Sequence, residues 1–322
     1  MTVRVGVIGT KNGHAAIIAG YLNGWSESVP TPVRAGGYLD PFYHFWQYQR
    51  TEETMVSGSP NLGGHARVTK IWSPDLSAAR QIAAACDIDE VSATIEEAST
   101  DVDAVMVLSG EPDEHPRQAG PALERGLPTF IDKPLGSDMD QCRAMYAQAA
   151  RGGARLFSAS GLRWSAEVKL AKQEFASGYA EPIEGIYVKV PNRMDQYGIH
   201  AVEMVNVVLG ADVRSVQGVT AGHRATAVLE YGSGQTAIIE TFYAQVRPSY
   251  CMVVYGQRHT KMYHLYDTSL PFIWMFDDFV KMVTDGTVPV PEEEVLRMML
   301  ITFAAERACA GGGEVQLPPY PG

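Results

Sequence analysis

The first half of the chain alternates short apolar runs with helical segments, and this alternation constrains the fold more than any other feature. The apolar runs are typical of buried strands and lie at Val3–Ile8, Ala66–Trp72, Asp103–Leu108, Thr129–Ile131 and Ala154–Ser158. Repeated strand-then-helix units predict a parallel sheet with right-handed crossover connections. We therefore expect an α/β domain over residues 1–160.

The pattern changes after Gly161. Helices are expected at about 165–176, 199–209, 272–284 and 292–309. Between the second and third of these helices, strands follow one another through short turns, as they do in antiparallel sheets. Residues 161–322 are therefore expected to form a separate α+β domain with a mainly antiparallel, open sheet.

Composition excludes several classes of function. The 322 residues carry a net charge of −11, which argues against a nucleic-acid partner and weakly against an anionic membrane surface. No apolar run approaches the roughly 20 residues that cross a bilayer, and a strand beginning at Val3 leaves no room for a signal peptide. The four cysteines lie far apart without a CxxC pair, so we expect a cytoplasmic protein with reduced thiols and no metal site.

The turn after the first strand is a candidate phosphate-binding site, because it leads directly into a helix expected at about 15–22. Free N–H groups and the helix dipole at such a helix start favour an anion. The turn consists of Gly9, Thr10, Lys11, Asn12 and Gly13. It only partly matches the dinucleotide fingerprint G-x-G-x-x-G, since Lys11 occupies the second glycine position and Gly13 comes one residue early. A Rossmann-like, dinucleotide-binding domain and a tight turn without a ligand both remain open.

The end of the second strand bears on the choice between NAD and NADP. Ser73 is expected to cap the next helix, with Pro74 at its first position. Ser73 also stands where a ribose-binding acid is expected. Asp75 could replace that acid, or the site could accept the 2′-phosphate of NADP, although no Arg or Lys directly follows the strand.

Residues 23–66 form a long insert that departs from the strand–helix pattern. The insert is rich in aromatic residues, namely Tyr38, Phe42, Tyr43, Phe45, Trp46 and Tyr48. A lid over the site, a subunit contact and packing of the insert on its own domain would each account for these rings. The sequence leaves the three alternatives open.

The segment Ile131–Pro134 joins a buried strand to a pair of opposite charges and a proline that cannot continue a sheet. Ligands bind at the carboxyl ends of the strands in open α/β sheets. Lys133 is therefore a candidate site residue, with Pro134 setting the direction of the exit. A surface Asp–Lys pair before a turn is the alternative.

His200 is the corresponding candidate in the second domain. With Met204, Val207 and Val208 it forms the buried stripe of a helix that is expected to begin beside it. A position at the helix start would favour a neutral imidazole that can accept a proton. Glu203 could orient the ring, and Asp195 precedes it in an expected loop. A capping histidine bonded to a carboxylate is the alternative, and a metal site is disfavoured because no second ligand pair has metal spacing.

Together these segments resemble the Gfo/Idh/MocA family of NAD(P)-dependent oxidoreductases over nearly the whole chain. Five motifs occur in the family's order: His115 with Ala122-Leu123, Gly126–Leu135 with Asp132 in place of the usual glutamate, Arg163 after the sixth strand, Gly198–Gly210 with Glu203 in place of the usual aspartate, and the closing segment from Asp285 to Leu317. The resemblance implies that Lys133 contacts the substrate hydroxyl near the nicotinamide and that His200 is the general base. The family's aspartate four residues before the histidine is Gln196 here, with Asp195 beside it.

The resemblance assigns three sets of site residues. The catalytic set is Lys133, His200 and Asp195, and the substrate-binding set is Lys133, Arg163, Gln196 and His200. The set expected to bind NAD or NADP is Gly9, Thr10, Lys11, Asn12, Gly13, Ser73, Asp75, Ser109, His115, Asp132, Lys133 and Pro134.

These residues imply a dehydrogenase or reductase that moves a hydride between nicotinamide and the CH–OH or C=O group of a sugar-like small molecule. The resemblance assigns substrate binding and homo-oligomerisation, as a dimer or tetramer, to the second domain. Two alternatives stay open. One is a redox-neutral lyase or glycosidase with tightly bound NAD, and the other is a regulatory protein that binds a dinucleotide without catalysis.

Overall fold

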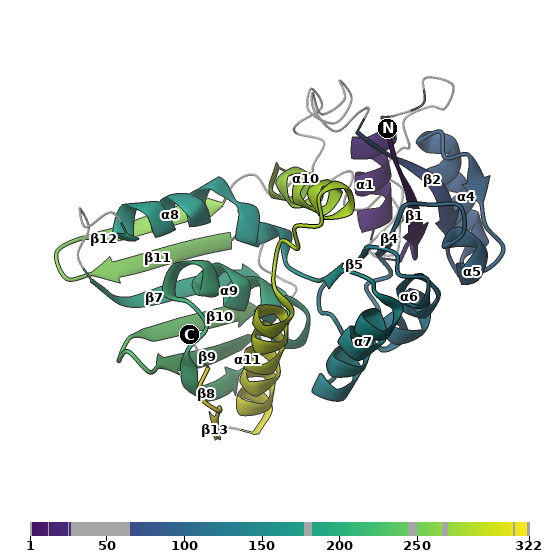
Figure 1. Ribbon diagram of the computed structural model, residues 1–322. Coiled ribbons are helices and arrows are strands. Elements are labelled where there is room, and N and C mark those ends of the chain that lie inside the picture. The colour runs from purple at the N-terminus through teal and green to yellow at the C-terminus, as the bar shows by residue number, and fades with distance from the viewer. Residues whose placement is uncertain are drawn as a thin grey trace. The chain divides into compact units, whose positions relative to one another are not determined.

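The computed structural model of the chain describes residues 2–11, 13–24, 26, 65–176, 182–243, 250–265, 270–311 and 313–320 (Figure 1). The chain divides into two compact units. The first comprises Met1–Ser158 with Ile273–Glu292, and the second comprises Ala159–Phe272 with Glu293–Gly322. Most of the aromatic insert lies outside the described residues, and so does Asn12 of the glycine turn.

The first unit contains a six-stranded sheet in the order β3-β2-β1-β4-β5-β6, and every pair of neighbouring strands is parallel. The strands are β1 (Val3–Ile8), β2 (Ala66–Trp72), β3 (Glu90–Val91), β4 (Ala104–Val107), β5 (Thr129–Ile131) and β6 (Leu156–Phe157). The helices are α1 (His14–Asn23), α4 (Leu76–Ala85), α5 (Ile95–Ala98), the 3₁₀ turn η2 (Pro112–Glu114), α6 (His115–Glu124) and α7 (Met139–Gly152). This strand order is that of dinucleotide-binding folds, so the expected parallel α/β architecture is confirmed.

The first unit also includes residues 273–292, which contain most of helix α10 (Leu270–Thr284). The sequence placed this segment in the second domain. Aromatic packing explains the difference: Phe276 lies edge-on to Phe130 of β5, and Phe279 lies against Phe157 of β6. The helix thus buries its rings on the two last strands of the parallel sheet.

The central strands end level with one another, which fixes the position of the site. Ile8 pairs with Val107, and Val107 pairs with Ile131. The residues that follow these strands are Gly9, Leu108 and Asp132, and each continues the pairing by a backbone hydrogen bond from its N–H to a neighbouring strand. Gly9, Ser109 and Lys133 are therefore brought to one edge of the sheet.

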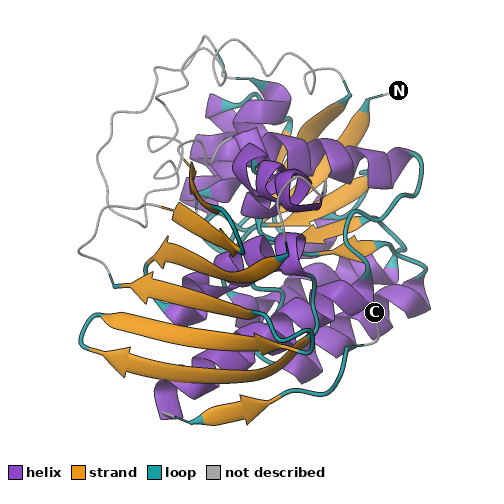
Figure 2. Cartoon of the chain, turned by 90° about the vertical axis from the view of Figure 1, so that its left-hand side faces the viewer, coloured by secondary structure: helices purple, strands orange, loops and turns teal. Residues whose placement is uncertain are grey.

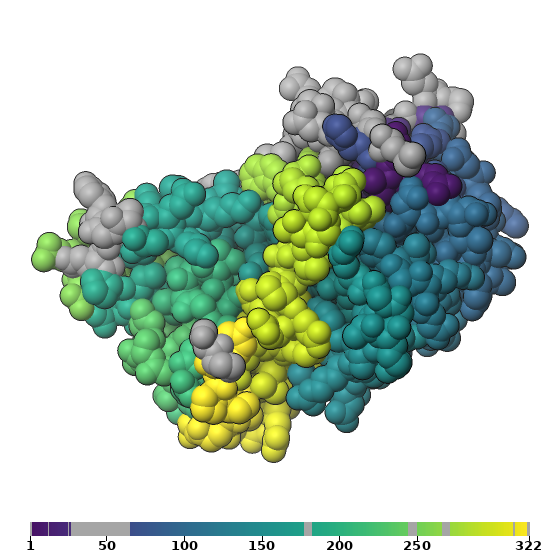
Figure 3. All heavy atoms as spheres, in the orientation of Figure 1, coloured from purple at the N-terminus to yellow at the C-terminus, as the bar shows by residue number. Residues whose placement is uncertain are grey.

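The second unit contains a seven-stranded sheet in the order β12-β11-β7-β10-β9-β8-β13. Its strands are β7 (Ile183–Pro191), β8 (Val213–Ala221), β9 (Arg224–Tyr231), β10 (Thr236–Phe242), β11 (Tyr250–Gly256), β12 (Thr260–Leu265) and β13 (Glu314–Gln316). Every pair is antiparallel except β7 with β10, which confirms the mainly antiparallel sheet. The strand β13 was not expected; it pairs with β8, and Glu314 and Gln316 on it are exposed. In Figure 3 the yellow C-terminal segment lies at the surface.

The helical elements of the second unit are the 3₁₀ turn η3 (Gly161–Trp164), α8 (Ala166–Ala176), α9 (Met194–Leu209) and α11 (Glu292–Gly311). Helix α9 packs on β7 and β10, and its residues from Gly198 to Asn206 are buried. In Figure 2 the strands of this sheet lie in front and helices lie behind them. The strand register places Val219, Ile238, Tyr255 and Met262 together on the face opposite α9, and all four are exposed.

Candidate functional site

Two glycines shape the turn between β1 and α1. Gly9 has a φ of 91°, and a Cβ atom there would lie 2.6 Å from Cα of Ser109, so only glycine fits this close approach. Gly13 precedes α1 with a φ of 75° and offers no side-chain cap to the helix. The first N–H groups of α1 therefore lack a capping side chain from Gly13 at the sheet edge where dinucleotide folds bind pyrophosphate. These features fit NAD(H).

The capping roles of Ser73 and Asp75 differ from those the sequence suggested. The hydroxyl of Ser73 lies 2.7 Å from that of Thr10, which ties the glycine turn to the end of β2, and it also accepts a hydrogen bond from the backbone N–H of Asp75. The expected N-cap at Ser73 is wrong, because the Asp75 carboxylate accepts the N–H groups of Ser77 and Ala78 at the start of α4. Asp75 occupies the N-cap position because a carboxylate caps a helix N-terminus at least as well as a hydroxyl. Its negative charge also complements the helix dipole.

The cations near this edge are paired with carboxylates. Lys11 forms an ion pair with Glu111, whose backbone N–H is donated to the hydroxyl of Ser109. Arg117 pairs with Glu114 at 2.7 Å, and its guanidinium lies 5.8 Å from the ring centre of Trp72, the last residue of β2.

Asp132 is held by a partner that sequence reasoning missed. Nδ1 of His14 lies 2.6 Å from one Asp132 carboxylate oxygen, and the other oxygen accepts the backbone N–H of Lys133 at 2.9 Å. Burial alone would raise the pKa of Asp132, but the attraction of His14 and Lys133 outweighs it and holds that pKa below its ordinary value. A signal was present, since His14 occupies the third glycine position of the fingerprint, five residues after Gly9.

Lys133 is the second residue after β5, its side chain is partly buried, and its bond to Pro134 is cis. Burial lowers the pKa of Lys133 below that of an ordinary lysine, although the Asp132 carboxylate opposes the shift. The amine of Lys133 therefore releases its proton more readily than that of an exposed lysine. His115 is fully buried and donates from Nδ1 to the carbonyl of Leu135, 3.0 Å away, so it supports the segment that follows Pro134.

His200 lies in the second unit and is buried, but it does not stand at a helix start. Helix α9 begins at Met194, so His200 is its seventh residue, and the expected effect of the helix dipole on the imidazole is wrong. The helix starts at Met194 because Arg193, in extended conformation, is its N-cap residue. The carbonyl of Arg193 accepts a hydrogen bond from the backbone N–H of Tyr197. Nδ1 of His200 lies 2.6 Å from the hydroxyl of Ser160, and the rings of Tyr197 and Tyr250 approach the imidazole edge-on.

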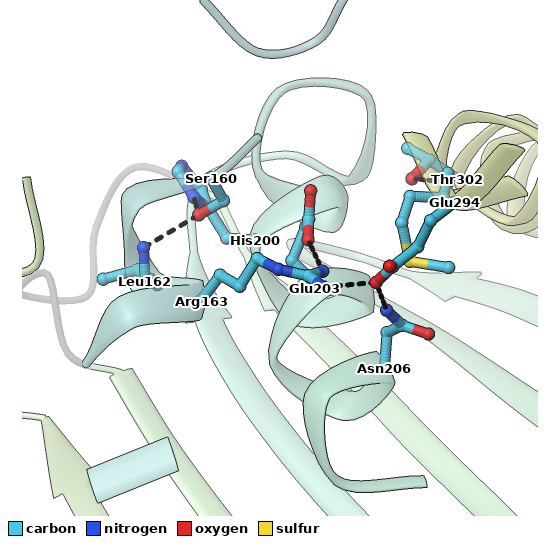
Figure 4. A network of polar contacts seen from close by, with 9 residues as sticks. Ser160, Leu162, Arg163, His200, Glu203, Asn206, Glu294 and Thr302 are labelled. Carbon is cyan, nitrogen blue, oxygen red and sulfur yellow. Dashed lines mark hydrogen bonds and ion pairs between the residues drawn. The ribbon is translucent and has the colours of Figure 1, made fainter. Parts of the chain in front are cut away.

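Arg163 and Glu203 form a buried network next to His200 (Figure 4). The Arg163 guanidinium donates to Glu203 at 2.7 Å and pairs with Glu294, which also accepts from Asn206. Glu203 therefore orients Arg163, and among the described residues it makes no direct hydrogen bond to His200. Burial raises the pKa of Glu203, while Arg163 opposes this shift. The guanidinium expected to bind substrate is thus bonded to two carboxylates.

Asp195 and Gln196 lie in the first turn of α9 and are exposed. Asp195 forms a bidentate ion pair with Arg193, with contacts of 2.6 and 2.9 Å. It belongs to the helix and not to the loop that the sequence suggested. Its carboxylate is held by Arg193 and makes no hydrogen bond to His200 among the described residues.

The structure thus forms two groups from the expected site residues. In the first unit, Gly9, Thr10, Ser73, Ser109 and Lys133 share one edge of the parallel sheet. In the second unit, Arg163 and His200 are joined through the segment that begins at Ser160. Within the described residues, no three His, Cys, Asp or Glu side chains are placed to hold a metal ion. No described helix has the length and apolar character needed to cross a membrane.

Comparison with solved structures shows the same fold over both units. A scyllo-inositol dehydrogenase from Lactobacillus casei, solved with NAD(H) and scyllo-inositol, is 15% identical with a TM-score of 0.76, and the match covers 98% of this chain and 99% of that one. A myo-inositol dehydrogenase from Corynebacterium glutamicum is 13% identical with a TM-score of 0.76, covering 99% and 100%. An oxidoreductase from Agrobacterium radiobacter, solved with NAD+, L-tartaric acid and magnesium, is 13% identical with a TM-score of 0.76, covering 98% of each chain.

No curated protein matches the chain in a sequence search. Residues 37–160, however, match the family model described as the oxidoreductase family with an NAD-binding Rossmann fold. This match falls on the unit that carries the parallel sheet, the glycine turn and Lys133. Residues 37–160 are therefore similar to the NAD-binding Rossmann part of the Gfo/Idh/MocA oxidoreductases.

Proposed function

We propose that this protein is a dehydrogenase that oxidises one CH–OH group of a neutral, polyhydroxylated small molecule, such as a cyclitol or sugar, with NAD+ as hydride acceptor. One observation carries the proposal: Lys133 follows β5 at the sheet edge that bears the glycine turn, and burial lowers its pKa. An amine whose pKa is lowered, at the sheet edge of a dinucleotide site, is better suited to accept a hydroxyl proton than an ordinary lysine. The inositol dehydrogenases among the structural neighbours act on compounds of this class.

The reaction divides between the bound nicotinamide and the side chains. Nicotinamide, when bound, accepts the hydride, which is the carbinol hydrogen with two electrons. The hydroxyl proton must leave in the same step and pass to a protein group, and the alcohol becomes a ketone. We propose that Lys133 and His200 are the groups that act on this hydroxyl, with Lys133 charged after proton transfer.

Several contacts support a neutral substrate. Arg163 is bonded to Glu203 and Glu294, and Lys11 is bonded to Glu111, so these cations are already neutralised. A substrate carboxylate or phosphate would have to displace a protein carboxylate from a buried guanidinium, which is costly. Hydroxyl groups need no such exchange, because they can both donate and accept hydrogen bonds.

The contacts around β2 support NAD over NADP. The exposed carboxylate of Asp75 stands just after the strand, where a 2′-phosphate would be repelled and a 2′-hydroxyl could donate a hydrogen bond. The nearby Arg117 is paired with Glu114. We therefore infer that NAD+ binds more tightly than NADP+.

The proposal also extends to assembly and location. The exposed face of the seven-stranded sheet supports a homo-oligomer, because Val219, Ile238, Tyr255 and Met262 gather on it. Cys86, Cys142, Cys251 and Cys309 are all free thiols, which supports a reducing cytoplasm.

The test of function combines binding and turnover. NAD+ at about 100 times its dissociation constant should stabilise the fold by about 2.7 kcal/mol, and NADP+ at the same concentration should stabilise it less. NADH should then accumulate with at least one compound from a panel of inositols and aldoses. Product formation without NADH would indicate the redox-neutral alternative, and dinucleotide binding without any turnover would indicate a regulatory protein.

Variants test the two side chains. Lys133→Met and His200→Ala should each lower kcat by about 10²- to 10⁴-fold, the contribution typical of a positioned proton-transfer group or of a hydrogen-bond donor to the developing charge. The double variant should lose much less than the product of the single effects if the residues act together. Near-normal turnover in either single variant would remove that residue from the proposed mechanism.

A further inference from the structure

We propose that Ser160 is a positioning residue that holds neutral His200 in the tautomer with its proton on Nε2. The tautomer follows from contacts inside the second unit. Its role in turnover rests on the dehydrogenase function proposed above. In that reaction the assignment makes His200 a hydrogen-bond donor to the reacting oxygen and leaves the hydroxyl proton to Lys133.

The argument begins with the hydrogen bonds of the Ser160 hydroxyl. Ser160 is fully buried, and its oxygen accepts the backbone N–H of Leu162 at 3.2 Å, which caps the turn η3. A hydroxyl has one hydrogen to donate, and buried donors find acceptors. In the part of the chain that the structure describes, the acceptor within reach of this hydroxyl is Nδ1 of His200, at 2.6 Å. Ser160 therefore donates and Nδ1 accepts.

The tautomer of the imidazole follows directly. A neutral imidazole carries one N–H, and the nitrogen that accepts a hydrogen bond is the one without it. Because Nδ1 accepts from Ser160, the proton lies on Nε2. If the proton were on Nδ1, both Nδ1 and Leu162 would donate to Ser160, and the buried hydroxyl hydrogen would lack an acceptor among the described residues.

Neighbouring contacts fix Ser160 itself, so the hydrogen bond is preorganised. The backbone N–H of Ser160 is bonded to Glu203, one turn after His200 on α9. Glu203 is bonded in turn to Arg163 of the same η3 turn, as Figure 4 shows. The turn and the helix are thus joined at two points, Ser160 to His200 and Arg163 to Glu203, and the ring cannot rotate without breaking a buried bond.

This assignment gives His200 and Lys133 different roles in the proposed reaction. Nε2–H can stabilise the negative charge that develops on the substrate oxygen as the hydride leaves. Neutral His200 in this tautomer cannot take the hydroxyl proton through Nε2. The proton passes to the neutral amine of Lys133, which becomes an ammonium group, while the C–H hydrogen and its electron pair pass to NAD+ and the carbinol becomes a carbonyl.

The direct test is nitrogen NMR of the full-length protein labelled with ¹⁵N-histidine, without substrate, at about pH 8, where ordinary histidines are neutral. The His200 signals are assigned as those missing in His200→Gln. We expect a pyridine-type Nδ1 and a pyrrole-type Nε2. The reverse pattern would overturn the proposal.

Variants separate this role from simple packing. Ser160→Ala should leave a mixture of His200 tautomers and lower kcat by about three- to tenfold, the effect of one hydrogen bond. Ser160→Thr keeps the hydroxyl, so it should show the single tautomer and the kcat of the wild type. Ser165→Ala is the matched control, because Ser165 is an equally buried hydroxyl at the other end of η3 that donates to Leu162 and not to His200.

The outcomes distinguish this inference from the proposed function. An unchanged His200 spectrum in Ser160→Ala, or an equal change in Ser165→Ala, would overturn the role of Ser160. The protein could instead show the expected His200 spectra and yet reduce no NAD+ with any inositol or aldose. That result would support the tautomer and count against the dehydrogenase function.

Discussion

Nδ1 of His14 lies 2.6 Å from the carboxylate of Asp132, and both side chains are almost fully buried. His14 is the first residue of α1, and Asp132 directly precedes Lys133. The contact therefore joins the helix start at the dinucleotide turn to the segment that carries the proposed proton acceptor. Where a typical fingerprint has a small third glycine for close packing, this chain has a ring that makes a buried polar bond.

The first prediction concerns the energy of this contact. His14→Phe keeps a ring but leaves a buried carboxylate without its main partner, and breaking a buried pair typically costs about 3–5 kcal/mol. The remaining hydrogen bond from the Lys133 backbone should place the loss of unfolding free energy at the lower end, near 3 kcal/mol. Urea denaturation of His14→Phe, Asp132→Asn and the double variant should give a coupling energy of about 1–3 kcal/mol. Additive losses would show that the two residues do not interact.

The second prediction concerns acid. The pKa of Asp132 in the folded state lies below its ordinary value, because His14 and Lys133 outweigh the effect of burial. A carboxyl whose pKa is depressed by folding adds stability above its unfolded pKa, near 3.9, and that stability is lost as the pH falls toward the folded pKa. The free energy of unfolding should therefore decrease below about pH 4 in the wild type and decrease less in Asp132→Asn. Parallel curves for the two proteins between about pH 5 and 2.5 would contradict this.

The third prediction concerns Gly9. Its φ is 91°, and a Cβ would lie 2.6 Å from Cα of Ser109, which belongs to the backbone and cannot move aside like a flexible side chain. Gly9→Ala should therefore weaken NAD+ binding at least tenfold, because β1, β4 and the turn must separate. Gly153→Ala is the matched control, since Gly153 has a φ of 73° with open space around its Cβ and lies at the end of α7. It should lose only about 1 kcal/mol of stability. Isothermal titration with NAD+ measures the affinity of each variant. Equal affinities of Gly9→Ala and Gly153→Ala would exclude a clash between the added Cβ and Ser109.

Much of the fold could be predicted from the sequence because local patterns determine it. Val3–Ile8 and Ala66–Trp72 are strands with the expected bounds, because their apolar residues are buried in the parallel sheet while Arg4, Arg67 and Lys70 are not. The site was less predictable because its contacts join distant segments. His14 and Asp132 are 118 residues apart, and Ser160 and His200 are 40 apart. The first residues of two helices were also predicted wrongly. Asp75 and Arg193 are the N-cap residues of α4 and α9, and the apolar periodicity of the sequence does not indicate these positions.

The fourth prediction concerns Arg163. Arg163→Met leaves Glu203 and Glu294 without their shared cation, so the unfolding free energy should fall by about 3–5 kcal/mol at pH 8. Burial already raises the pKa of Glu203, and protonation would relieve part of the loss, so the deficit should be smaller at pH 5. Urea denaturation at the two pH values tests this. If Arg163 instead binds substrate directly, the variant should raise KM while stability stays near that of the wild type.

The last prediction concerns the exposed face of the seven-stranded sheet. Ile238 of the central strand β10 lies opposite Tyr187 and Val228, and Val219, Tyr255 and Met262 lie on the same face. Exposed apolar side chains on one sheet face, lying among polar residues such as Glu240 and Lys189, make a candidate subunit contact. Ile238→Glu would place a charge at its centre, where burial without a partner costs several kcal/mol, so the oligomer should dissociate at least tenfold more readily. Leu170→Glu serves as the control, because Leu170 is somewhat more exposed than Ile238 but lies on helix α8. Sedimentation of the three proteins at equal concentrations should show a smaller species for Ile238→Glu alone, and a wild type that is already monomeric would refute the proposed interface.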